Sequence, residues 1–172
     1  MRRHRIGTSL YAGVLFVVLG TLAWASGQPF IFPSLGPSAF ILAFQRDGDR
    51  TGLGSVVVSH LVGGVAGLFA YSLLAGGVSL VADPTAFSMG GLRLVASATL
   101  SLVVTSWGMI ATDTVHAPAC ATTLIVSLGL LSTPLQVAVI VAGVGVLVVF
   151  HALVLSAYHR ATDPSRPGLV DG

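Results

Sequence analysis

The residues best able to do chemistry in this sequence are a few polar side chains set within long apolar runs. The strongest group is the stretch from Thr112 to Ala119, which contains Asp113, His116 and Pro118. Proline suits the first position of a helix because it has no N–H to lose there. We therefore predict a helix that starts at Pro118, with His116 just before it. The exposed amides and positive dipole end of such a helix attract anions.

A second group repeats this device earlier in the chain, from Pro33 to Ser38. Gly36 precedes Pro37 and is the predicted cap of a helix that starts at this proline, and the hydroxyls of Ser34 and Ser38 add hydrogen-bond donors. For either motif alone, a proline that only marks a helix entry explains the pattern equally well. Two copies favour an anion site between the two helix starts.

Ionisable residues within apolar runs are functional candidates, because burying them in a membrane is costly. His60 lies near the middle of the uncharged run 51–82, where a neutral histidine bonded to a neighbouring helix is the simpler interpretation and a pathway lining is the other. His116 is the stronger candidate, since Asp113 is close enough in sequence to favour its charged form. His151 is interpreted as a packing or interfacial residue.

The composition excludes a water-soluble fold. Hydrophobic residues make up 54% of the 172 residues and charged residues 8%, with a mean hydropathy of +0.93, whereas soluble domains carry about a quarter charged residues. The net charge of +2 does not indicate nucleic acid, because Arg2, Arg3 and Arg5 stand directly before the first apolar run. The predicted partner is the lipid bilayer.

Polar and proline-containing breaks divide the chain into six segments, four long and two short. The predicted bounds are about 7–25, 30–44, 51–82, 94–111, 117–131 and 135–158. This predicts an all-α, polytopic transmembrane bundle: a single domain over 1–160 followed by a polar tail, 161–172. The halves, about 6–82 and 92–159, share one plan of long, short and long segments, which suggests a 3+3 pseudo-repeat. Short, proline-broken segments at matching places in two halves indicate a transporter's substrate site.

Within the run 51–82, Ser59, Gly63 and Gly67 recur at every fourth residue. This spacing of small residues lets helix backbones approach closely in lipid. We interpret it as a packing face.

Two topologies remain open. If all six segments cross the membrane and the N-terminus is cytoplasmic, Arg93 is the single arginine outside, the C-terminus is also cytoplasmic, and the two halves are inverted. If the short segments are re-entrant, four helices cross and the halves are parallel. The arginine distribution favours six crossings.

The sequence offers little for enzymatic or metal chemistry. The histidines and Asp113 are scattered without metal-ligand spacing, and Cys120 is a single cysteine. There is no Gly-x-Ser-x-Gly or His-Glu-x-x-His motif, and no lysine for a phosphate loop. We expect no metal, no cofactor and no enzyme.

Three stretches resemble the HPP family of small membrane proteins, named for a His-Pro-Pro motif. They are Ser34-Leu35-Gly36-Pro37-Ser38-Ala39, Ser59-His60-Leu61-Val62-Gly63, and Thr114-Val115-His116-Ala117-Pro118-Ala119 with Ala121-Thr122. The resemblance implies four transmembrane helices and a transport-related role, and nitrite is the substrate attributed to plant chloroplast members. The chain departs from the motif at Ala117, which stands where the first proline is expected.

Together these observations predict a multi-pass cell-membrane transporter or channel for a small inorganic anion, with nitrite suggested by the resemblance. The expected substrate-binding residues are Ser34, Gly36, Pro37, Ser38, His60, Asp113, Thr114, His116 and Pro118. The alternative is a membrane sensor or assembly partner that transports nothing. A single bundle and a homo-oligomer are both compatible with the glycine-rich faces.

Overall fold

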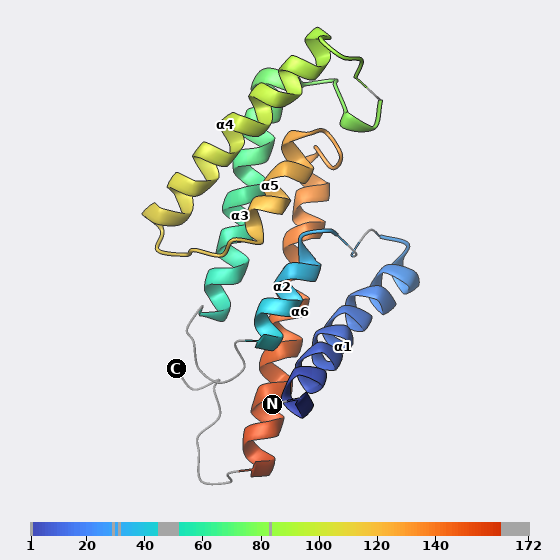
Figure 1. Cartoon of the computed structure of the whole chain (residues 1–172), viewed down its shortest axis with the longest axis vertical. Coiled ribbons are helices and arrows are strands. Elements are labelled where there is room, and N and C mark those ends of the chain that lie inside the picture. The colour runs from blue at the N-terminus through green and yellow to red at the C-terminus, as the bar shows by residue number, and fades with distance from the viewer. Residues whose placement is uncertain (1, 29, 31, 45–51, 83, 163–172) are drawn as a thin grey trace.

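The protein is a bundle of helices, seen here in a computed structural model that describes residues 2–28, 30, 32–44, 52–82 and 84–162 (Figure 1). Its α-helices are α1 (Arg2–Ser26), α2 (Leu35–Phe44), α3 (Leu53–Ala70), α4 (Met89–Ala111), α5 (Ala119–Ser127) and α6 (Pro134–Thr162). A π-helical turn, Tyr71–Ala75, extends α3, and a short 3₁₀ turn, Leu80–Ala82, precedes α4. The described residues contain no strand, which confirms the all-α prediction.

Four helices are long and apolar enough to cross a bilayer: Ile6–Ser26, Leu53–Ala75, Met89–Ala111 and Pro134–Thr162. At 1.5 Å per residue a helix needs about 20 residues to cross the hydrocarbon core, and these have 21, 23, 23 and 29. They confirm a multi-pass membrane protein. The exposed faces of these helices carry apolar side chains suited to contact with lipid, such as Val17 on α1 and Val103 on α4.

The two short helices differ from the predicted segments by being shorter still. The segments were expected over about 30–44 and 117–131, but α2 has 10 residues and α5 has 9. Such helices reach only about 15 Å, half of a hydrocarbon core. Their preceding residues are extended or turn-like instead, because Pro33 and Pro118 lack the N–H that a continuing helix would need.

Helix direction shows how the chain returns between the long helices. In Figure 1, α1 and α3 run the same way along the bundle and α2 runs back between them; α4 and α6 share the reverse direction and α5 runs back between those two. Each short helix therefore runs antiparallel to the long helices that precede and follow it in the chain. The choice between six crossings and two re-entrant segments stays a prediction.

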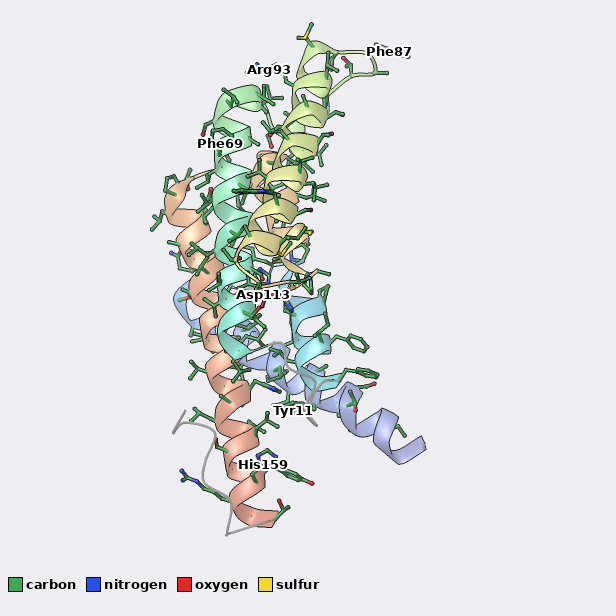
Figure 2. The ribbon with its side chains drawn as sticks, turned by 90° about the vertical axis from the view of Figure 1, so that its left-hand side faces the viewer. Tyr11, Phe69, Phe87, Arg93, Asp113 and His159 are labelled. Carbon is green, nitrogen blue, oxygen red and sulfur yellow. The ribbon has the colours of Figure 1, made fainter. Side chains whose placement is uncertain are left out.

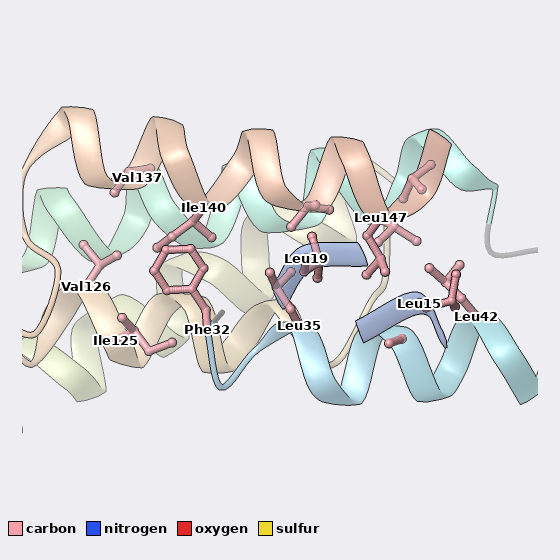
Figure 3. Packing of buried hydrophobic residues seen from close by; sticks show 14 residues of the cluster. Leu15, Leu19, Phe32, Leu35, Leu42, Ile125, Val126, Val137, Ile140 and Leu147 are labelled. Atoms are coloured by element: carbon pink, nitrogen blue, oxygen red, sulfur yellow. The ribbon is translucent and has the colours of Figure 1, made fainter. Parts of the chain in front are cut away.

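The apolar core gathers side chains of α1, α2, α3, α5 and α6 together with Phe32 before α2 (Figure 3). Its largest fully buried members are Leu15, Leu19, Leu35, Ile140 and Leu147. Burying a side chain of this kind contributes about 1.5 to 3 kcal/mol in water; in lipid, close packing replaces much of that driving force. The core fixes α2 against the longest helix of the bundle.

Helix ends follow local capping rules. Thr133 and Gln136 form a reciprocal capping box before Pro134, with Thr133 N donating to Gln136 Oε1 at 3.1 Å and Gln136 N donating to Thr133 Oγ1 at 3.3 Å. Ser88 caps α4 by accepting a bond from Gly91 N at 3.1 Å. This cap explains why α4 begins at Met89, earlier than the predicted position near 94.

The predicted packing face of small residues lies between α3 and α5. A β-carbon on Gly63 would stand 2.8 Å from the carbonyl oxygen of Ala119, and one on Gly67 would stand 2.9 Å from that of Thr123. Only a residue without a side chain allows this approach. The packing interpretation is confirmed, and it presses α5 directly onto the helix that carries His60.

The two ends of the bundle are marked by charged or polar residues. Figure 2 places Arg93 and Phe87 near one end and His159 near the other. Arg93 donates from Nε to the carbonyl of Leu74 at 2.7 Å and from a terminal nitrogen to that of Gly76 at 3.2 Å, which closes the end of α3. Arg46, Arg50 and Arg166 lie outside the described residues, as does most of the predicted tail, so the cytoplasmic placement of the termini stays a prediction.

Candidate functional site

Four polar side chains from four places in the sequence form one buried hydrogen-bonded chain. Ser38 Oγ lies 3.0 Å from His60 Nε2 and 3.1 Å from His116 Nε2. His60 Nδ1 lies 2.7 Å from Thr122 Oγ1. His116 is 3% exposed and the other three are fully buried. We call Ser38, His60, His116 and Thr122 the histidine cluster.

Ser38 is held by the first turns of α2. Its hydroxyl also donates to the carbonyl of Ser34 at 3.0 Å, one turn earlier in the chain. The helix begins at Leu35, two residues before the predicted start at Pro37, so Ser34 occupies the expected cap position in place of Gly36. The hydroxyl of Ser34 is fully buried and has no hydrogen-bond partner among the described residues.

His60 is positioned by the same helix face that packs on α5. Ser59, its neighbour, donates a hydrogen bond to the carbonyl of Thr114. That bond satisfies a carbonyl in the irregular stretch before α5, where no helix provides a partner. The close approach at Gly63 then brings Thr122, one turn into α5, within reach of the His60 ring.

His116 lies just before α5, as predicted, and Pro118 is buried beside the first helical residue, Ala119. The expectation of exposed amides at this helix start is wrong. The amides of Ala119 and Cys120 donate to the carbonyls of His116 and Ala117 at 2.9 and 3.0 Å, and Ala121 donates to Pro118 at 3.1 Å. A tight turn consumes these donors. Donors for a ligand must therefore come from hydroxyls and imidazoles.

The remaining predicted site residues do not join the histidine cluster. Asp113 is exposed, with a left-handed φ of 51° at the end of α4, and Figure 2 shows it about midway along the bundle. No hydrogen bond joins it to a histidine among the described residues. Thr114 contributes its carbonyl to Ser59, while its hydroxyl lies 2.6 Å from that of Thr112. Gly36 and Pro37 are in the first turn of α2, and Pro37 is exposed.

Thr122 was missed as a site residue. Hydroxyl residues are common in membrane helices, and the sequence alone does not show which face of α5 a threonine occupies. The available signal was its spacing from Pro118. Thr122 comes one helical turn after this proline, so its side chain lies on the same helix face as the predicted helix start.

A second row of buried hydroxyls ties α4 to α5 away from the histidine cluster. Ser97 donates to the carbonyl of Ser127 at 2.9 Å, and the Oγ1 atoms of Thr105 and Thr123 are 2.8 Å apart. At the other side of the bundle, Tyr11 on α1 bonds His151 on α6 at 2.9 Å, in line with the packing role predicted for that histidine. These bonds are structural supports outside the histidine cluster.

Formal charge is scarce around the cluster. The histidine rings of residues 60 and 116 have centroids 5.5 Å apart, and Arg93 is bound at the far end of α3. No group of three or more metal-binding side chains occurs in the part of the chain that the structure describes. The arrangement can donate and accept hydrogen bonds and can exchange a proton.

A family model described as HPP, transmembrane region, matches residues 2–167 of the chain. The match covers nearly the whole sequence and includes every residue of the histidine cluster. No curated protein and no solved structure matches the chain significantly.

Proposed function

The chain belongs to the HPP transmembrane family, and we propose that it is a transporter or channel for a small inorganic anion, with the histidine cluster as the binding site. The observation that carries the proposal is the meeting of two short helix starts at a buried, uncharged set of donors. Residues this polar are expensive to bury in a membrane protein and usually mark a substrate path.

Several donors can serve an anion there. The hydroxyl of Ser34 is buried and unpartnered, and an unsatisfied buried hydroxyl costs about 1 to 3 kcal/mol, which a ligand oxygen would recover. The positive end of α2 adds roughly 0.3 to 2 kcal/mol. A proton on His116 Nδ1 would add a further N–H donor, because both Nε2 atoms already bond Ser38.

Nitrite is the substrate that the family resemblance suggests. It carries one negative charge on two oxygens, each able to accept hydrogen bonds from a hydroxyl or an imidazole. Nitrate, formate and chloride share the charge and differ in shape, so they test how far the site selects. We propose no enzymatic activity, because the Ser38 hydroxyl donates its hydrogen to the Ser34 carbonyl and is not arranged to give it to an imidazole.

We further propose that the halves form an inverted pair. Each half contributes two long helices and one short, reversed helix, and the two short helices run in opposite directions (Figure 1). An inverted pair presents similar barriers to the two sides of a membrane, which is the basis of alternating access in many transporters.

The proposal is tested by anion flux into proteoliposomes of the purified protein, with nitrite, nitrate, formate and chloride. Ser38→Ala removes the oxygen that both imidazoles share, and we expect flux to fall about tenfold, equivalent to roughly 1.4 kcal/mol. Ser97→Ala is the matched control, since it deletes a fully buried serine hydroxyl with one carbonyl partner outside the site. It should keep full flux.

Equal flux in the two variants would remove the histidine cluster from the transport path. Absence of flux for every anion, in protein that is folded by thermal unfolding in detergent, would favour the sensor or assembly-partner function instead.

A further inference from the structure

The hydroxyl of Ser38 fixes where the protons of the histidine cluster lie. This oxygen is within hydrogen-bond distance of three groups: the Ser34 carbonyl, His60 Nε2 and His116 Nε2. A carbonyl can only accept, so the single hydrogen of the hydroxyl goes to Ser34. All three bonds form together only if both Nε2 atoms carry hydrogen and donate to the Ser38 oxygen.

The two Nδ1 atoms then become acceptors with different surroundings. His60 Nδ1 accepts the hydrogen of the Thr122 hydroxyl at 2.7 Å. His116 Nδ1 has no hydrogen-bond partner among the described residues. A proton can therefore join His116 at Nδ1 without breaking any bond of the cluster, whereas a proton on His60 would force the Thr122 hydroxyl to reverse.

The histidine cluster can carry one added proton, but not two. With ring centroids 5.5 Å apart, two imidazolium charges in a buried site would repel strongly. The described elements around His116 offer few other titratable groups: α2 has none, α5 has Cys120, α3 presents His60, and Asp113 on the same loop is exposed.

An anion in this site also lacks a fixed counter-charge. Among the described side chains, Arg93 is engaged at the end of α3 and Arg160 is exposed near the end of α6. The helix ends carry only fractional charges. One proton on His116 would balance one monovalent anion and leave the loaded site with no net charge.

We infer that His116 binds one proton at Nδ1 with each anion, so that the protein moves the two together as an electroneutral pair. The inference rests on the proposed function and adds the coupling ion and its stoichiometry. Loading places the proton on Nδ1 and the anion beside it; release returns His116 to the neutral form. No other group changes its charge.

The test uses proteoliposomes with nitrite as the probe and a pH-sensitive dye inside. Protein-free vesicles are subtracted, because nitrous acid crosses bilayers unaided. We expect a lower external pH to drive nitrite inward, one internal proton to appear per nitrite, and a membrane potential set with potassium and valinomycin to leave the rate unchanged. His116→Gln keeps a side-chain N–H for Ser38 but has no basic nitrogen, so it should lose the response to the pH gradient.

Nitrite flux that follows the membrane potential, without internal acidification, would overturn the inference while leaving anion transport intact. Absence of any protein-dependent flux would overturn the proposed function and the inference together. A second measurement is ¹⁵N NMR of the histidine rings in lipid nanodiscs. Nitrite should convert His116 to the doubly protonated form and leave His60 neutral, and nitrite binding with both rings unchanged would also refute the coupling.

Discussion

Replacing Gly63 with alanine should disturb the site from a residue that has no functional group of its own. The added carbon would lie 2.8 Å from the Ala119 carbonyl oxygen and 2.7 Å from Thr123 Oγ1, whereas ordinary contacts begin at 3.4 Å. The carbonyl belongs to the backbone of α5 and cannot rotate away. A helix displacement of about 0.6 Å, the difference between 3.4 and 2.8 Å, is therefore needed to relieve the contact.

The cost of this substitution can be separated from the effect of alanine on helix stability. Overpacking of a tight contact costs about 1 to 3 kcal/mol, while alanine stabilises a helix interior by roughly 0.5 to 1 kcal/mol relative to glycine. Gly145→Ala on α6 is the matched control, because no atom lies within 4 Å of its added carbon. The Gly63 variant should be less stable than the Gly145 variant by about 1 to 3 kcal/mol.

The same displacement should reduce transport. It moves Thr122 relative to His60, whose 2.7 Å hydrogen bond crosses the α3 and α5 interface, and misplacing a functional group by 1 Å costs up to about 100-fold in comparable sites. We expect roughly a tenfold loss of nitrite flux. The assays are thermal unfolding in detergent and flux in proteoliposomes. Equal stability and equal flux in the two glycine variants would refute the argument that this contact holds the cluster together.

Two further substitutions distinguish function from support. Thr122→Val keeps the shape of the side chain but removes the hydroxyl that donates to His60, so flux should fall several-fold, and Thr122→Ser should restore it; full flux in the valine variant would show that this bond is dispensable. Tyr11→Phe removes the hydroxyl bonded to His151, which should lower stability by about 1 kcal/mol and leave flux unchanged, whereas lost flux at native stability would extend the site to α6.

The sequence was most informative where a local rule decides the structure. Long uncharged runs predicted the four spanning helices, and proline-containing breaks predicted the short segments, because apolar length and a missing N–H act within a few residues. The sequence predicted that the two helix starts carrying Ser38 and His116 face one another, but it did not predict the hydrogen bond between these two side chains. The bond itself depends on how α2 and α5 pack, which no local pattern specifies.

The errors in the predicted site have tertiary or turn-level causes. Asp113 was grouped with His116 because only two residues separate them, yet its left-handed backbone at the end of α4 leaves the side chain exposed. The amides at the start of α5 were expected to be open, but the turn from His116 to Ala121 uses them internally. Proximity in sequence predicted neither result, since each depends on backbone angles within the turn.

The departure from the family motif at Ala117 can be weighed against these contacts. Ala117 is exposed, and its carbonyl accepts a hydrogen bond from Cys120 N at 3.0 Å, a bond that a proline at the same position would also accept. The residue before a proline already prefers an extended backbone, so Pro118 imposes much of the restriction that a first proline would add. His116, Pro118 and Ala119 are the buried members of this turn. The alanine therefore changes the exposed side of the turn and leaves the imidazole that faces Ser38 in place.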